Sequence, residues 1–252
     1  MKQIVITGAL GYIGTELCKL YSGFSWKYEV VAIDNRFISE RVNELKRRKI
    51  KFVQADILDF ETIKPHIKKA EIVHHLAGIT DVAYVKKEAD KEKDALTEKV
   101  AIDGTANVLA SMNENATIVF PSTHVVFEGL NEPKENIDEN EKTNTFLVYS
   151  SSKVENENQI QKSGKNYVIL RLGSVYGFST DTMRINIMPN LFSKIASQNG
   201  KIKLFGGGVQ LKSLVPLIDV ARCFKFVEEK QDLKSGIYNL TKENLCVKDV
   251  AD

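Results

Sequence analysis

Short apolar runs alternate with amphipathic stretches along most of the chain. Six runs have the length and composition of buried strands, at residues 2–7, 29–33, 50–54, 71–77, 116–120 and 167–172. Helical spacing of apolar positions separates several of these runs, at residues 15–20, 60–69, 92–113 and 148–163. Strands that alternate with helices form a parallel sheet covered on both faces, so the pattern predicts an α/β fold with a doubly wound parallel sheet.

A glycine-rich turn follows the first apolar run, Gly8-Ala9-Leu10-Gly11-Tyr12-Ile13-Gly14. A strand, a glycine turn and a helix in this order are typical of dinucleotide binding, because glycines let the backbone approach a pyrophosphate and the helix N-terminus attracts its charge. The spacing is G-x-x-G-x-x-G rather than G-x-G-x-x-G, so this segment alone is a weak signal.

The second apolar run ends at Asp34, twenty positions after Gly14. A carboxylate at this place can accept hydrogen bonds from both ribose hydroxyls of an adenosine, which favours NAD over NADP. Arg36 offers the alternative, since its guanidinium could meet a 2′-phosphate. The sequence therefore predicts NAD as the cofactor, with NADP less favoured.

Size and charge limit the classes of partner. The 252 residues suit one large α/β domain, alone or with a small appendage, and the net charge of +2 indicates neither a nucleic-acid nor a membrane partner. The chain begins with a strand rather than a signal peptide. Three distant cysteines without metal-type spacing favour a reducing cytoplasm. The charged run 86–94 is interpreted as a solvated helix or loop face, and the polar stretch 129–146 as a surface loop.

The segment Tyr149-Ser150-Ser151-Ser152-Lys153 lies in the predicted helix 148–163. Residues four apart share a helix face, and an ammonium near a phenol favours the phenolate, so Lys153 is expected to lower the pKa of Tyr149. Thr123, after the fifth strand, can hydrogen-bond the reacting oxygen. Beside a dinucleotide turn, this set predicts hydride transfer on an alcohol or a ketone.

These segments together resemble the extended short-chain dehydrogenase/reductases, the NAD-dependent epimerase/dehydratase group. The resemblance covers nearly the whole chain. It rests on the turn Thr7–Gly14, the segments His75–Gly78, Gly104–Leu109 and Leu170–Gly177, the helix from Tyr149 to Lys153 with Glu157, and the stretch Gly206–Asp219.

The resemblance implies a Rossmann-type domain over residues 1–177, which includes the catalytic helix. A small, truncated C-terminal substrate lobe would cover residues 178–252 and be interleaved with the last strands of the sheet. In that later part we expect a helix at 184–198, strands at 214–219 and 237–240, and a helix from Asp219 to about 230. The chain would end inside a further helix.

The resemblance also implies roles for individual residues. Tyr149 would be the catalytic base, Lys153 its electrostatic partner and Thr123 the oxygen anchor. The expected cofactor contacts are Gly8, Leu10, Gly11, Tyr12, Ile13, Gly14, Asp34, Asn35, Arg36, Asp56, Ile57, Leu76, Ala77, Gly78, Tyr149 and Lys153. The substrate would be a nucleotide-linked sugar, with His124, Ser174 and Lys212 as contacts. A homodimer is expected, in which helices 92–113 and 148–163 pair with their copies.

Departures from the family pattern narrow the reaction. Sugar 4,6-dehydratases carry Asp-Glu after the anchoring threonine, whereas His124 and Val125 follow Thr123 here. Ala101 stands where the family often has asparagine, so one hydrogen bond of that helix is expected to be missing. Lys212 stands where arginine is usual, and lysine binds phosphate as a point charge rather than as a planar fork. His74 and His75 are interpreted as strand residues rather than catalytic ones.

The leading hypothesis is an NAD-dependent nucleotide-sugar epimerase that works through a transient keto-sugar, by hydride transfer to and from bound NAD. The segment Ser122–Gly129 resembles that of keto-sugar reductases, so an NAD(P)H-dependent reductase of a keto-sugar or small carbonyl is the alternative. A 4,6-dehydratase or a non-enzymatic dinucleotide-binding protein is less favoured, because fold alone does not establish activity.

Overall fold

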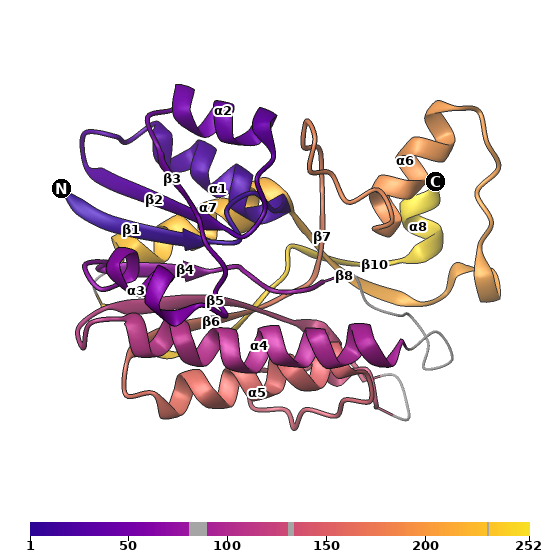
Figure 1. Ribbon diagram of the computed structural model, residues 1–252. Helices are drawn as coiled ribbons and strands as arrows, with labels where there is room; N and C mark the ends of the chain where they lie inside the picture. Colours follow the sequence, from indigo (N-terminus) through magenta and orange to yellow (C-terminus); the bar gives the residue numbers. More distant parts are fainter. Residues whose placement is uncertain (81–89, 131–133, 231) are drawn as a thin grey trace.

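A parallel sheet forms the centre of the molecule (Figure 1). The computed structural model describes residues 1–80, 90–130, 134–230 and 232–252. Within these residues the sheet has seven strands in the order β3-β2-β1-β4-β5-β6-β9. The strands are β1 Lys2–Thr7, β2 Tyr28–Asp34, β3 Lys51–Gln54, β4 Ile72–His75, β5 Thr117–Thr123, β6 Asn166–Leu172 and β9 Gly236–Leu240. The strand order reverses between β1 and β4, and open sheets of this kind bind their ligands at the carboxyl ends of the strands beside such a reversal.

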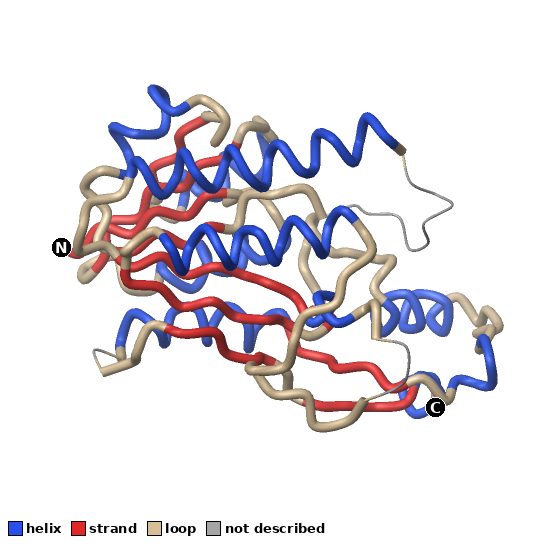
Figure 2. Tube along the Cα trace, turned by 90° about the horizontal axis from the view of Figure 1, so that it is seen from below, coloured by secondary structure: helices blue, strands red, loops and turns tan. Residues whose placement is uncertain are grey.

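Helices cover both faces of the sheet, as Figures 1 and 2 show. One face carries α1 Tyr12–Ser22, α2 Ser39–Arg47 and α7 Leu217–Glu229, and the other carries α3 Phe60–Ile67, α4 Lys91–Ser111 and α5 Val148–Lys162. In β1, Ile4 and Ile6 pack with Leu17 and Phe224 in one core cluster, whereas Val5 packs in the other. Strands buried on both faces are apolar throughout rather than alternating, which explains the continuous runs in the sequence.

The sequence predicted most of these elements, and α2 is an exception. The helix from Ser39 to Arg47 buries only Leu45 completely, with Val42 and Ile38 partly buried against the same core, so its apolar stripe is too short for a clear sequence signal. The N-termini of α3 and α4 carry clear signals, since Asp59 accepts a hydrogen bond from the Thr62 amide and Asp90 accepts two from Glu92 and Lys93. Residues 86–89 of the charged run lie outside the described residues.

A smaller sheet lies beyond the carboxyl ends of the main strands. It contains β7 Ser174–Tyr176, β8 Leu211–Pro216 and β10 Glu243–Cys246, where β8 pairs with β7 in parallel and with β10 in antiparallel orientation. Two helices, α6 Met188–Ser197 and α8 Val247–Ala251, and two 3₁₀ turns, η2 His124–Phe127 and η3 Phe205–Gly208, complete the described elements. The sequence analysis predicted neither β7 nor β10, which are short and only partly buried.

The structure corrects two boundaries in this later part. The strand expected at 214–219 begins at Leu211 and ends at Pro216, and the helix expected from Asp219 begins at Leu217. Pro216 donates no backbone hydrogen bond, so the strand ends there and the helix follows directly. The helix expected from residue 184 begins at Met188. The division of the chain at residue 177 remains a prediction, and β9 adds to the main sheet beside β6.

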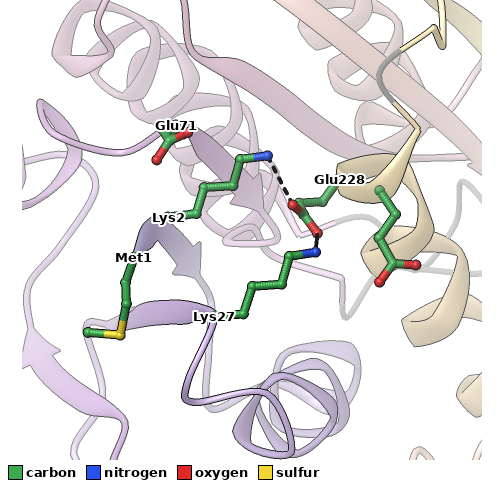
Figure 3. Close-up of a pocket in the computed structure, with 6 residues that line it drawn as sticks. Met1, Lys2, Lys27, Glu71 and Glu228 are labelled. Carbon is green, nitrogen blue, oxygen red and sulfur yellow. Dashed lines mark hydrogen bonds and ion pairs between the residues drawn. The ribbon is translucent and has the colours of Figure 1, made fainter.

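The amino ends of β1 and β2 are joined to α7 by a charged cluster (Figure 3). The buried carboxylate of Glu228 lies 2.9 Å from the Lys2 ammonium and 3.7 Å from that of Lys27, and it accepts a hydrogen bond from the Tyr28 hydroxyl. Burial raises the pKa of Glu228, but the hydrogen bonds from Tyr28 and Lys2 outweigh it, so the net pKa is lowered. This cluster lies at the opposite end of the sheet from the predicted site.

No helix among the described residues is long and apolar enough to cross a bilayer.

Candidate active site

The glycine turn is packed tightly against the end of β4. Gly8 has a φ of +68°, and a Cβ there would lie 2.7 Å from the Ala77 amide nitrogen. A Cβ at Gly14 would lie 2.3 Å from the Gly8 carbonyl oxygen. The Thr7 hydroxyl also accepts a hydrogen bond from the Ala77 amide at 3.2 Å. Glycine is therefore required at Gly8, where the turn crosses the end of β4, and at Gly14, in the first turn of α1, which begins at Tyr12 within the glycine-rich segment.

Asp34 lies at the end of β2 with its carboxylate beside this turn. The residue is 5% exposed, and its carboxylate accepts hydrogen bonds from the Leu10 amide at 3.0 Å and from the Arg36 side chain at 3.2 Å. Asn35 donates instead to Asp56, at 3.1 Å. The structure therefore brings the predicted ribose-binding carboxylate and the alternative phosphate-binding guanidinium into one ion pair.

The other predicted cofactor residues lie around the same turn. Leu76, Ala77 and Gly78 form the exit of β4, and nothing lies within 4 Å of a Cβ built at Gly78. The side chain of Ile57 is turned into the core, where it contacts Gly104 of α4. Asp56 accepts a hydrogen bond from the Leu58 amide. A contact of Ile57 with an adenine would thus come from its backbone rather than from its side chain.

Thr123, Tyr149 and Lys153 meet at the carboxyl end of β5. Thr123 is the last residue of the strand, and Tyr149 and Lys153 lie in the first turns of α5. The Lys153 ammonium donates to the Pro121 carbonyl oxygen at 2.9 Å and lies 5.9 Å from the centre of the Tyr149 ring. The predicted catalytic set is therefore assembled beside the end of β4 and the glycine turn.

The charges around Tyr149 differ from the sequence-based expectation. Burial raises the pKa of Tyr149 above its ordinary value, while the Arg184 guanidinium and a hydrogen bond from Thr123 oppose this rise. Burial lowers the pKa of Lys153 to about 8, and the Glu157 carboxylate opposes this fall. The net shift of the Tyr149 pKa is upward, and Lys153 is not among its causes, so the effect expected of Lys153 stays a prediction. The Lys153 ammonium is directed at a backbone carbonyl, and the cation that acts on the phenol is Arg184.

A buried ion pair joins α5 to the main sheet. Glu157 and Arg171 form two hydrogen bonds, at 3.0 and 2.8 Å, and each side chain is less than 5% exposed. Ser122 also donates to Glu157. This contact fixes α5 to β5 and β6 one helical turn beyond Lys153, and so fixes the position of Lys153 relative to Thr123.

The two histidines of β4 are structural, as the sequence predicted. His75 lies between the hydroxyls of Thr7 and Thr105, at 2.8 and 3.0 Å, and His74 contacts the Tyr21 hydroxyl at 2.8 Å. Burial lowers the pKa of each histidine to about 3. Both rings are therefore neutral at physiological pH.

The replacement at Ala101 leaves α4 and α5 joined. Asn156 of α5 donates to the Ala101 carbonyl oxygen at 2.9 Å and to the Thr105 hydroxyl at 3.0 Å. A side chain on the neighbouring helix thus links the two helices through the backbone of residue 101, where the expected asparagine side chain is absent.

The three predicted substrate residues lie near the small sheet. His124 begins η2, and its Nδ1 donates to the Leu172 carbonyl oxygen at 2.9 Å. Burial lowers the pKa of His124, the hydrogen bond to Leu172 opposes this, and the Lys212 charge adds to the fall. Ser174 begins β7 and pairs with Leu214 of β8, the strand that carries Lys212. The structure therefore gathers His124, Ser174 and Lys212 in one region, beyond Thr123.

The sequence analysis missed three charged residues of this site. Arg184 faces Tyr149 and Tyr12, and Arg41 of α2 contacts Asp181. Arg184 stood at the start of the helix expected at 184–198 but lies before α6, in the same segment as Asp181, and Arg41 lies in the helix that was not predicted. No sequence motif marks these three residues, because only folding of the chain brings them close to the glycine turn.

A comparison with known protein families matches residues 4–241 to the NAD dependent epimerase/dehydratase family. The chain belongs to this family. It is an enzyme family, and the match includes the glycine turn, β5 and α5.

Two relatives of this chain carry names of different reactions within the family. A protein of Methanocaldococcus jannaschii, provisionally named a UDP-glucose 4-epimerase, is 30% identical over 87% of this chain and 71% of its own length. A dTDP-D-glucose 4,6-dehydratase of Dictyostelium discoideum is 25% identical over 95% of this chain and 58% of its own length. These similarities agree with membership of the family, and the two relatives are named for different reactions.

Solved structures show the same fold. A UDP-glucose 4-epimerase of Thermotoga maritima with UDP-glucose has a TM-score of 0.82 at 23% identity, over 99% of this chain and 80% of that one. A UDP-glucose 4-epimerase of Thermus thermophilus in complex with NAD has a TM-score of 0.79 at 22% identity, over 99% and 81%. The seven-stranded sheet with helices on both faces is thus the fold of the family.

Proposed function

We propose that this chain is an NAD-dependent nucleotide-sugar epimerase that works through a transient keto-sugar. The observation that carries the proposal is the meeting of Thr123, Tyr149 and Lys153 beside a glycine turn and a buried carboxylate, Asp34. The similarity to the provisionally named epimerase of Methanocaldococcus jannaschii supports this reaction over others of the family.

The residues around the turn fit a dinucleotide. Gly8 and Gly14 leave no room for side chains, so backbone amides and the N-terminus of α1 can approach a pyrophosphate. Asp34 lies where a carboxylate can accept ribose hydroxyls, and its burial keeps it in place. The complexes of related epimerases with NAD support the same cofactor here. NAD, when bound, would supply the acceptor and the donor of a hydride.

The side chains of this chain would handle the proton. The Tyr149 phenolate would take the proton of a sugar hydroxyl and later return it, and the Thr123 hydroxyl would hydrogen-bond the same oxygen. Arg184 would favour the phenolate by its charge, against the burial that raises the pKa of Tyr149, and Lys153, 5.9 Å from the centre of the ring, would add to this effect. Epimerisation requires that the sugar ring present its other face before the hydride returns.

The substrate contacts follow from the second cluster. Lys212 extends from β8 near His124 and would bind a pyrophosphate as a point charge. Ser174, at the start of β7, would face the same ligand. A nucleotide linked to a sugar through a pyrophosphate fits this arrangement, with the sugar directed towards Tyr149. The identity of the sugar and of the base is left to the first experiment.

A reductase is the second candidate, and one contact favours it. The Arg36 side chain is 55% exposed and paired with Asp34, so it could turn to a 2′-phosphate and accept NADPH. The chain would then reduce a keto-sugar or another carbonyl with net consumption of the cofactor. A 4,6-dehydratase is disfavoured because η2 places His124 and Val125 after Thr123, where an acidic pair would be needed.

The first experiment is to denature the purified protein and identify the released small molecule by mass spectrometry. An equimolar amount of NAD, together with interconversion of UDP-glucose and UDP-galactose without net NADH formation, would support the epimerase. Empty protein that binds NADPH more tightly than NADH and consumes it with a keto-sugar would favour the reductase instead.

The assembly and the location belong to the same proposal. The helices α4 and α5 lie side by side on one face, as Figure 2 shows, and Asn156 joins them. We expect them to pair with their copies in a homodimer of a cytoplasmic enzyme, and a nucleotide-sugar as the ligand. Sedimentation that gives only monomers at all concentrations would exclude this dimer.

A further inference from the structure

A segment between β7 and α6 lies against the glycine turn. We call residues 177–187 the strap. Figure 1 shows the strap as the loop that follows β7 and rises beside α2. Its first residue, Gly177, has a φ of +128°, which turns the chain away from β7. The strap therefore leaves the small sheet and returns to the cofactor side of the molecule.

The strongest contact of the strap is with Arg41 of α2. Its Nε lies 2.7 Å from the Asp181 carboxylate, and its Nη2 donates to the Asp181 carbonyl oxygen at 2.8 Å. The remaining Nη1 donates to the carbonyl oxygen of Leu10, in the glycine turn, at 2.6 Å. The Arg41 side chain is only 16% exposed, so one planar guanidinium joins the strap to the turn.

Three further contacts fix the strap along its length. The Tyr12 hydroxyl donates to the Gly177 carbonyl oxygen, and the hydroxyls of Thr15 and Thr182 lie 3.2 Å apart. Both Tyr12 and Thr15 belong to the first turn of α1. At the other side, Arg184 donates to the Thr80 carbonyl oxygen, beyond the exit of β4, at 3.1 Å.

The positions of these contacts define what the strap covers. Its anchors lie on the glycine turn and the first turn of α1, which follow β1, and beyond the end of β4, so they stand on both sides of the point where the strand order reverses. A pyrophosphate held at the N-terminus of α1 would lie between these anchors. A ligand in that place could leave only after the strap had moved.

We infer that Arg41 and Asp181 form a clasp that holds the strap across the dinucleotide site, so that opening of the clasp limits the release of the cofactor. The inference rests on the proposed function, because an epimerase that recycles its cofactor gains from retaining it between turnovers. Arg41 and Asp181 are positioning residues, since they touch the turn and the strap rather than the reacting atoms.

The test is the rate of NAD release. The protein is first loaded with radiolabelled NAD. It is then mixed with excess unlabelled NAD, and the label that stays bound is followed over time by rapid filtration. The variants R41Q and D181N should each release NAD roughly tenfold faster than the wild type, which is the effect expected for loss of one charge-assisted bond. The double variant should be no faster than the faster single one, because both changes break one contact.

The matched control is R47Q, on the same helix. Arg47 pairs with Glu44 and is 77% exposed, so the wild-type release rate should be kept. Asp181 is 46% exposed, and D181N is therefore expected to fold even if R41Q does not. A release rate of D181N within twofold of the wild-type rate would overturn the clasp. A wild-type protein that already releases NAD as fast as R41Q and D181N would overturn it as well.

The clasp and the proposed function fail in different ways. If the wild type interconverts nucleotide-sugars but the variants release NAD at the wild-type rate, the clasp is wrong and the epimerase stands. If the variants release NAD faster but the wild type converts no nucleotide-sugar, the clasp stands and the epimerase is wrong.

Discussion

The two ends of the central sheet both carry charged clusters, and they differ in how the charges are paired. At the amino ends, the Glu228 carboxylate is matched by the ammonium groups of Lys2 and Lys27. At the carboxyl ends, Arg36 and Arg41 also form ion pairs, but the two cations beside Tyr149 do not: Lys153 donates to the Pro121 carbonyl and Arg184 to the Thr80 carbonyl. A carbonyl oxygen accepts a hydrogen bond but does not cancel the charge of the donor.

The difference indicates what each end is for. A carboxylate surrounded by cations stabilises the fold but has no charge left for a ligand. Cations held by carbonyl oxygens keep their charge, and Arg184 accordingly opposes the rise in the pKa of Tyr149. The amino end therefore joins α7 to the sheet, whereas the carboxyl end keeps cations beside Tyr149, the proton acceptor of the proposed reaction. Substitutions at the two ends should separate stability from activity.

The largest effect is expected for Tyr149→Phe. Removal of the phenol hydroxyl removes the proton acceptor, so turnover of the nucleotide-sugar should fall by roughly 10² to 10⁴. The release of NAD on denaturation should be unchanged, which mass spectrometry can check. Ser151→Ala, an exposed position on the same helix, is the control and should keep full turnover. Turnover of Tyr149→Phe close to that of the wild type would remove Tyr149 from the mechanism.

At the other end of the sheet, Glu228→Gln should change stability and not turnover. Loss of the charge should lower the free energy of unfolding by about 2 kcal/mol, as for a hydrogen-bonded buried charge. Urea titration at neutral pH measures this change. A variant that lost turnover while keeping its stability would contradict the separation of the two ends.

The same substitution has a signature in pH. The pKa of Glu228 is lowered in the folded protein, so its contribution is present above the pKa of the unfolded chain and is lost as the pH falls through the folded pKa. The difference in stability between the wild type and Glu228→Gln should therefore shrink on acidification. Urea titrations at neutral and acidic pH would show a constant difference if Glu228 were not the group responsible.

A smaller effect is expected for Arg184→Met. Burial raises the pKa of Tyr149 and Arg184 opposes this, with Thr123 as hydrogen-bond donor and Lys153 beside the ring. Without the guanidinium the pKa of the phenol should rise further, so the acid limb of kcat/KM should move to higher pH. Arg47→Met serves as the control. An unshifted pH profile would mean that Arg184 has no effect on the phenol.

The smallest effect is expected for Arg36→Ala. Its ion pair with Asp34 is exposed on the arginine side, and such pairs contribute little to stability. The affinity for NADH should therefore stay close to that of the wild type, as fluorescence titration can measure. A large loss of NADPH binding, with NADH binding kept, would instead favour the reductase.

The sheet and the catalytic helix were predictable from local patterns. The inner strands of the main sheet, β1, β2, β4, β5 and β6, are apolar because they are buried on both faces, and Tyr149 and Lys153 have the spacing of one helix face. The helix α2 gave a weaker signal, because its apolar stripe is short: only Leu45 is fully buried, and Val42 and Ile38 are partly buried. Its absence from the prediction also concealed Arg41, which now proves to contact the glycine turn.

The sequence by itself determined the α/β class, the glycine turn, Asp34 and the set of Thr123, Tyr149 and Lys153, since each depends on neighbours in the chain or on helical spacing. Only the tertiary structure decided which charges face one another. Arg184 is 35 positions from Tyr149 and Asp181 is 140 from Arg41, so no local pattern relates them. Burial, which raises the pKa of Tyr149 and lowers that of Lys153, likewise exists only once the chain has folded.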